Sequence, residues 1–330
     1  MGLNNYPENK LARKVIAKHS LKVPFNLEDL VQQYAKLIYK SIPIDGVDGV
    51  SINLKVPGKK PTIVLNTDAS KTRQKFTLAH ELGHIIIPWH IGTIVDNIYN
   101  DSYKNYEYSL KEQQANRFAS ELLMPFEWII DEYEEFKDDL SSLHQRIAVQ
   151  AGVSLQASAI RLIQVLPSNI VYTAEKFGMI VLHSGKTEGT NTFVQDSGMI
   201  FKENFYPYVD SYTVCGTSSE TYHWWKISSE VFIDAEDQRV WQEILDNIIH
   251  DIQPNDDIEY FRKKVVGIMS FAHGKVKSTG DYNVNTVVAA CIHRLRRSEL
   301  DDLTQHKDFE KFVKIRCQAF FDKNKKPKKK

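Results

Sequence analysis

Residues 80–84 read His80-Glu81-Leu82-Gly83-His84, and they lie near the end of a helix predicted over Lys71–Ile87. Ser70 is the expected N-cap of this helix, and Pro88 ends it because proline cannot continue a helix. Residues four apart share one helix face, so the imidazoles of His80 and His84 can bind one metal ion together. We therefore predict that this helix carries a metal site.

Glu81 follows His80 directly, so its carboxylate is expected beside the metal rather than bound to it. Zinc lowers the pKa of a water molecule to about 7, which makes a nearby carboxylate a sufficient base. Glu81 is therefore the predicted general base. Two histidines and a glutamate at this spacing also occur by chance, so the prediction needs a third ligand.

Two residues are candidates for that third ligand, and the first is His90, six residues after His84. This is the spacing of enzymes with the sequence H-E-x-x-H-x-x-G-x-x-H, in which a glycine allows the chain to turn towards the metal. Ile87 occupies the glycine position here. The sequence therefore favours the other candidate.

The other candidate is Glu112, near the start of a helix predicted over Leu110–Met124. It shares a stripe with Ala115 and Ala119, and small residues would let this helix pack closely against the first one. A carboxylate in line with a buried stripe needs a positive partner or loses its charge. The alternative is a capping box over Ser109-Leu110-Lys111-Glu112, in which Glu112 only bonds the N-cap amide.

The two helices carry sequences that are more specific together than either is alone. They are Lys75-Phe76-Thr77-Leu78-Ala79-His80-Glu81-Leu82-Gly83-His84 and Glu112-Gln113-Gln114-Ala115-Asn116-Arg117-Phe118-Ala119-Ser120-Glu121-Leu122-Leu123-Met124-Pro125, with the strand Thr62-Ile63-Val64-Leu65-Asn66 upstream. Over roughly residues 20–165 the chain resembles the ImmA/IrrE-type metallo-endopeptidases. The resemblance implies Zn²⁺ on His80, His84 and Glu112, with Glu81 as general base. It also implies that Asn116 orients a ligand, although Asn116 can equally be a polar residue at a helix edge.

The expected fold class is α+β: a zincin-like peptidase domain over residues 1–140 with a helix-turn-helix-like extension, then a separate α+β domain. The extension is placed over residues 141–167, where Ala148-Val149-Gln150-Ala151-Gly152-Val153-Ser154 has the spacing of a helix-turn-helix. Short apolar runs begin after Pro167, so residues 168–322 form the second domain, by analogy a sensor or a substrate-capture module. Residues 323–330 form a basic tail.

Helical periodicity predicts further helices over Asn9–Ser20 and from Leu27 to Ile38, the latter capped by Asn26. Strands are predicted over Val50–Val56 and Pro61–Asn66. The second domain is expected to hold its longer helices over Asp237–Ile252, Asn285–Arg297 and Phe309–Phe321. It carries no chemical motif, and His223-Trp224-Trp225 is interpreted as aromatic packing.

The composition limits the partners and the compartment. Lys+Arg and Asp+Glu each number 42, so the formal net charge is zero, unlike that of proteins that coat nucleic acid. The second helix of the helix-turn-helix-like segment offers Gln156 and Arg161 but little other basic character, so DNA is not the favoured partner. Scattered cysteines, the absence of an apolar signal segment and the lack of a membrane-length apolar run predict a cytoplasmic protein with no membrane partner.

The predicted activity is zinc-dependent hydrolysis of a peptide bond in a protein substrate. The family resemblance suggests a helix-turn-helix transcriptional repressor as that substrate, and hence a role in regulation. The alternative is a non-catalytic regulator that uses the zinc fold and the helix-turn-helix-like segment to bind a partner protein or DNA. The intact Glu81 favours catalysis.

Overall fold

The helix that carries the H-E-x-x-H sequence forms as predicted. In the computed structural model it is α3 (Lys71–Ile86), and the Ser70 side chain caps it by accepting a hydrogen bond from the Arg73 amide at 3.3 Å. It ends at Ile87, directly before Pro88. His84 therefore lies in the last turn, and His80 lies one turn earlier on the same face.

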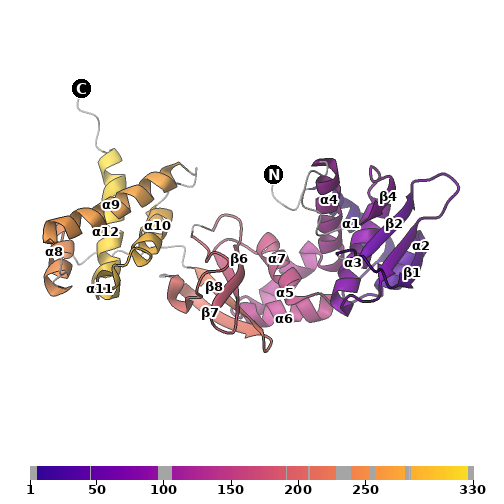
Figure 1. Ribbon diagram of the computed structural model, residues 1–330, viewed down its shortest axis with the longest axis horizontal. Coiled ribbons are helices and arrows are strands. Elements are labelled where there is room, and N and C mark those ends of the chain that lie inside the picture. The colour runs from indigo at the N-terminus through magenta and orange to yellow at the C-terminus, as the bar shows by residue number, and fades with distance from the viewer. Residues whose placement is uncertain are drawn as a thin grey trace, which may run out of the picture. The chain divides into compact units, whose positions relative to one another are not determined.

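The structure describes residues 6–325 apart from residue 45, residues 96–105, 191, 207–208, 228–238, 253–256, 279–281 and 283 (Figure 1). These residues form two compact units, one of Met1–Pro167 with Thr213–Gly216 and the other of Ser168–Tyr212 with Thr217–Lys330. Both units contain helices and strands. The α+β fold class is confirmed.

A four-stranded sheet supports α3 in the first unit. Its order is β1-β3-β2-β4, with bounds β1 (Lys36–Lys40), β2 (Gly49–Leu54), β3 (Thr62–Asn66) and β4 (Gly92–Val95). β1 and β3 are parallel, whereas β2 is antiparallel to both β3 and β4. α3 packs on β2 and β3 and contacts α4 (Tyr106–Leu123) as well (Figure 1).

Strand β1 differs from the prediction. The helical pattern from Leu27 to Ile38 suggested one helix, but α2 (Leu27–Tyr34), capped by Asn26 as expected, stops at Ala35. Leu37 and Ile38 instead pair with Ile63 and Val64 of β3. Backbone pairing with an existing strand outweighed the local periodicity, because strand preference depends strongly on tertiary context.

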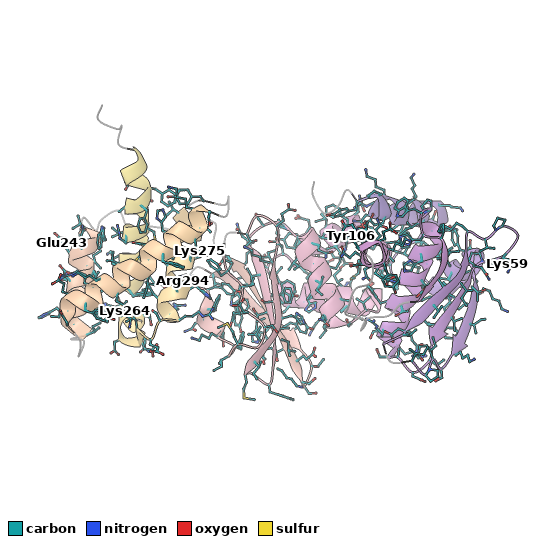
Figure 2. The ribbon with its side chains drawn as sticks, turned by 45° about the horizontal axis from the view of Figure 1, so that its top comes forward. Lys59, Tyr106, Glu243, Lys264, Lys275 and Arg294 are labelled. Carbon is teal, nitrogen blue, oxygen red and sulfur yellow. The ribbon has the colours of Figure 1, made fainter. Side chains whose placement is uncertain are left out.

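Close packing between α3 and α4 depends on small residues. A Cβ atom at Gly83 would lie 3.0 Å from Cδ1 of Phe118, so a larger residue would force the Phe118 ring to shift. Ala115 and Ala119 are fully buried. α4 already begins at Tyr106 (labelled in Figure 2), so Ser109 lies inside the helix and the capping-box alternative for Glu112 is wrong.

Three helices follow α4: α5 (Phe126–Phe136), α6 (Leu140–Ala151) and α7 (Leu155–Val165). Gly152, at φ +64°, turns the chain between α6 and α7, and Ser154 caps α7. Arg161 is 4% exposed, and its Nη2 donates to Oε2 of Glu121 at 2.5 Å. Glu121 Oε1 also accepts from Nε of Arg13 in α1 (Pro7–His19) at 2.7 Å. The buried Arg161 is therefore not available to contact DNA phosphates.

The second sheet has the order β6-β5-β8-β7: β5 (Ile170–Lys176), β6 (Ile180–Lys186), β7 (Val209–Gly216) and β8 (Glu220–Ile227). It belongs to the second unit except for the end of β7, Thr213–Gly216, which is part of the first unit. A short 3₁₀ helix, η2 (Glu203–Phe205), precedes β7. Trp224 and Trp225 on β8 are buried, which agrees with their interpretation as packing residues.

The remaining helices are α8 (Trp241–Ile252), α9 (Ile258–Lys277), α10 (Val284–Arg296), α11 (Asp301–Gln305) and α12 (Phe309–Lys325), and they share one core. α9 was not predicted, yet it buries Val265, Met269 and Ala272 and carries Lys264 and Lys275 (Figure 2). Of the predicted basic tail, residues 323–325 end α12, and residues 326–330 lie outside the described part of the chain. No described helix is both long and apolar enough to cross a bilayer.

Candidate metal centre

The structure brings together the three predicted metal ligands. The Nε2 atoms of His80 and His84 are 2.9 Å apart. From the neighbouring helix α4, Glu112 places Oε2 3.2 Å from Nε2 of His80 and Oε1 3.4 Å from Nε2 of His84. Both histidines are buried, so the cluster lies in the contact between α3 and α4.

The outer nitrogens of the two histidines are hydrogen-bonded elsewhere. Nδ1 of His80 lies 2.9 Å from Oδ1 of Asn116, and Nδ1 of His84 lies 2.8 Å from Nδ1 of His90. An amide oxygen only accepts, so Nδ1 of His80 carries the proton and its Nε2 presents a lone pair to the cluster. This contact is the one expected of Asn116 if it orients a ligand.

The cluster fits a divalent cation. Two imidazole nitrogens and a carboxylate converge, with donor atoms within 4.8 Å of one another. Lone pairs and a negative charge this close repel each other unless a cation lies between them. Ligand atoms on a tetrahedral zinc ion with bonds of about 2.0–2.1 Å are about 3.3 Å apart, close to the separations found here.

The electrostatics of the cluster favour the protonation states that a metal requires. Burial alone would raise the pKa of Glu112, but the close approach of the His80 and His84 imidazoles to its carboxylate outweighs burial and lowers the pKa to about 2. Burial lowers the pKa of His84 to about 4. At neutral pH the carboxylate is therefore ionised and the imidazole of His84 is neutral, as metal ligands must be.

Glu81 is fully buried and is held by the sheet rather than by the cluster. The hydroxyl of Ser51 in β2 donates to its Oε2. Gly49, two residues earlier on the same strand, leaves room for the carboxylate, because a Cβ atom there would lie only 2.7 Å from Oε1. Neither residue was identified from the sequence, although residues two apart on a strand share a face and could have suggested a common neighbour.

His90 lies behind His84 and not at the donor cluster. It is fully buried, and its Nδ1 faces the outer nitrogen of His84. Its Nε2 lies 2.9 Å from Oε1 of Gln114. The side chain that remains at the cluster beside the two histidines is therefore Glu112.

The fold and the site together define a zincin-like α+β domain with a candidate metal centre. Residues 33–162 match a family described as the IrrE N-terminal-like domain. The segment is also similar to two proteins described as "Radiation response metalloprotease IrrE". The one from Deinococcus deserti is 31% identical in an alignment of 131 residues that covers 35% of this chain and 45% of the relative. The one from Deinococcus radiodurans is 32% identical in an alignment of 114 residues that covers 33% of each chain. Over residues 33–162 the chain therefore resembles the IrrE-type metalloproteases in sequence.

The similarity has a limited extent. The matched segment spans less than half the length of either curated relative. A solved structure described as a "Mycobacterium tuberculosis transcriptional regulator" aligns with 68% of this chain and 77% of its own, at 11% identity and a TM-score of 0.40.

Proposed function

We propose that the protein is a zinc-dependent endopeptidase that hydrolyses a peptide bond in a protein substrate. The observation that carries the proposal is the convergence of His80, His84 and Glu112, with the buried carboxylate of Glu81 one residue from the first ligand. The similarity to proteins described as metalloproteases supports it.

Each residue of the site has a distinct task in this reaction. When bound, zinc supplies the Lewis acidity that polarises the scissile carbonyl and lowers the pKa of the attacking water to about 7. Glu81 accepts a proton from that water and passes it to the leaving amine. Ser51 holds the Glu81 carboxylate by its hydrogen bond, so the base is oriented before substrate arrives.

For the substrate we propose a helix-turn-helix transcriptional repressor in the cytoplasm, on the basis of the family resemblance. For the C-terminal unit we propose a role in sensing a signal or capturing the substrate, by analogy alone. Cleavage of a repressor would change gene expression without any contact between this protein and DNA. That route agrees with the balanced charge of the chain and with the burial of Arg161.

Glu81→Gln tests catalysis directly. The substitution keeps the size of the side chain and all three ligands, so the purified variant should retain its zinc. Loss of a positioned general base costs about 10² to 10⁴ in rate, and cleavage of a protein substrate should fall by that factor. A variant that keeps both zinc and full cleavage activity would refute the proposed mechanism.

Metal analysis of ligand variants provides the control for this experiment. His80→Ala and His84→Ala each remove one of the three protein ligands and should lose most of the zinc, and Glu112→Gln should bind zinc more weakly. Full zinc occupancy in the histidine variants would disprove the assignment of the site. If instead Glu81→Gln preserves the biological effect of the protein without cleavage, the protein is a binding regulator.

A further inference from the structure

A chain of hydrogen bonds leads from the protein surface to Nδ1 of His84, the nitrogen that faces away from the donor cluster. Nε1 of Trp89 donates to Oε1 of Gln114 at 2.8 Å, and Nε2 of His90 lies 2.9 Å from the same oxygen. Nδ1 of His90 lies 2.8 Å from Nδ1 of His84. Trp89 is 44% exposed, whereas His90 and His84 are fully buried.

The chemistry of the indole determines the first two bonds of this chain. An indole nitrogen can only donate a hydrogen bond, so the Gln114 atom that faces Trp89 must be the amide oxygen. The same oxygen faces Nε2 of His90, and an amide oxygen can only accept. Nε2 of His90 must therefore carry a proton.

The position of that proton determines the last bond. A neutral imidazole carries one proton, so Nδ1 of His90 presents a lone pair towards His84. Nδ1 of His84 must then donate, which leaves the lone pair of its Nε2 facing His80 and Glu112. If His90 carried a second proton, on Nδ1, that N–H group would point at the N–H group on Nδ1 of His84 whenever Nε2 of His84 binds a metal.

We propose that Trp89, Gln114 and His90 are positioning residues that hold His84 in its Nδ1–H tautomer, the form that binds a metal through Nε2. The inference rests on the proposed metal site and deepens it. In water a neutral histidine favours the opposite tautomer, with the proton on Nε2, so the chain of hydrogen bonds opposes an intrinsic preference. Outer partners of this kind typically change metal affinity by 10- to 100-fold.

The turn after α3 explains why His90 takes this role and not that of a ligand. The His90 amide donates to the carbonyl of Ile87 at 3.2 Å, so the chain folds back at Pro88 and Trp89. This turn returns the His90 ring to the outer nitrogen of His84, with ring centroids 4.8 Å apart. His90, six residues after His84, therefore contacts the nitrogen of His84 that faces away from the donor cluster.

Imidazole nitrogen NMR of the full-length, metal-free protein tests the tautomer without any need for catalysis. The His84 signals, assigned by their loss in His84→Ala, should show the proton on Nδ1 in the wild type. In His90→Ala this population should shift towards the proton on Nε2. His90→Gln restores a side-chain oxygen that can accept from His84, so it should recover much of the Nδ1–H form.

Zinc affinity is the second readout. His90→Ala should weaken zinc binding by about 10- to 100-fold, with His90→Gln between the variant and the wild type. Trp89→Phe removes the donor that orients the Gln114 amide, so it should cause a smaller loss in the same direction. Trp128→Phe is the matched control, because Trp128 bonds Glu132 within α5 and should leave both readouts unchanged.

The outcomes separate this inference from the proposed function. An unchanged His84 tautomer in His90→Ala, or unchanged zinc affinity, would overturn the role of the hydrogen-bond chain even if the protein proves to be a peptidase. Conversely, a wild-type protein with the Nδ1–H tautomer and zinc-dependent shifts but no cleavage would reject the peptidase and leave the positioning role intact.

Discussion

Position 49 has no room for a side chain. A Cβ atom there would lie 2.7 Å from Oε1 of Glu81 and 2.6 Å from Cγ2 of Thr77, and both atoms are part of the tightly packed helix α3. Gly49→Ala should therefore displace the Glu81 carboxylate while leaving all three metal ligands in place. A misplacement of about 1 Å can cost about 10²-fold in rate, so cleavage should fall by roughly that factor while zinc content is retained.

Gly274→Ala is the control for this prediction. A Cβ atom at Gly274 would meet nothing within 4 Å, and the residue lies in helix α9 of the other unit. Cleavage by this variant should equal that of the wild type. If Gly49→Ala is equally active, Glu81 does not depend on the sheet for its position.

At the scale of single residues, spacing along helices identified the candidate ligands but not their supports. His80 and His84 are four residues apart, and Glu112 shares a helix stripe with Ala115 and Ala119, so spacing along the sequence was enough to predict these three ligands. Ser51 and Gly49 approach Glu81 only because β2 pairs with β3 in a particular register. Gln114 meets Trp89 only because the chain turns back after α3. Neither arrangement leaves a periodic signal in the sequence.

Among the elements, Glu121 of α4 joins three other helices. It is fully buried and accepts hydrogen bonds from Arg13 of α1 and Arg161 of α7, and from the Phe126 amide at the start of α5. Glu121→Ala would leave the buried Arg161 guanidinium without its carboxylate. Breaking a buried pair from one side costs about 3–5 kcal/mol, and denaturant unfolding of the first unit should show a loss of that size.

Glu134→Ala is the matched control for this stability measurement. Its carboxylate is 68% exposed and lies 3.8 Å from Lys137 on the surface of α5. Substitutions of this kind change stability by about 0.5 kcal/mol or less. A similar small loss for Glu121→Ala would mean that solvent or another charge compensates Arg161.

Helices with clear start and stop signals were predicted well at the element scale. α3 has Ser70 and Pro88 at its ends, and Asn26 caps α2. The end of α2 was wrong because pairing with β3 took Leu37 and Ile38 into a strand. α9 was missed although the sequence marks it: Asp257 caps it, and its buried residues Phe261, Val265, Met269, Ala272 and Val276 are three or four apart.

On the scale of the whole molecule, the reactivity of the three cysteines can be used to follow the unfolding of each unit separately. Cys215 belongs to the first unit, and Cys291 and Cys317 belong to the second, and all three are buried. Burial raises the pKa of Cys215 to about 12, and burial also raises the pKa of Cys317. The thiolate is the reactive form, so the native protein should resist thiol-specific alkylation at neutral pH.

At Cys215 and Cys317 this protection should persist into mildly alkaline solution, because a raised thiol pKa keeps the thiolate scarce until the pH approaches that value. Labelling followed by mass spectrometry during a denaturant titration should show Cys215 reacting as the first unit opens, and Cys291 with Cys317 as the second opens. Rapid labelling of any of the three in the native protein would contradict their burial.

The four-helix junction at Glu121 also bears on how this protein can be divided or recombined. Arg161 of α7 neutralises the buried carboxylate of Glu121 in α4, which also binds Arg13 of α1. The helix-turn-helix-like pair α6 and α7 therefore cannot be transferred to another protein as an independent module. A fragment that stops before α7 would leave an unneutralised charge in its interior, and α7 transplanted elsewhere would take a buried guanidinium with it. Gene fusions and engineered truncations should therefore keep the whole first unit, Met1–Pro167 with Thr213–Gly216, around the candidate metal centre.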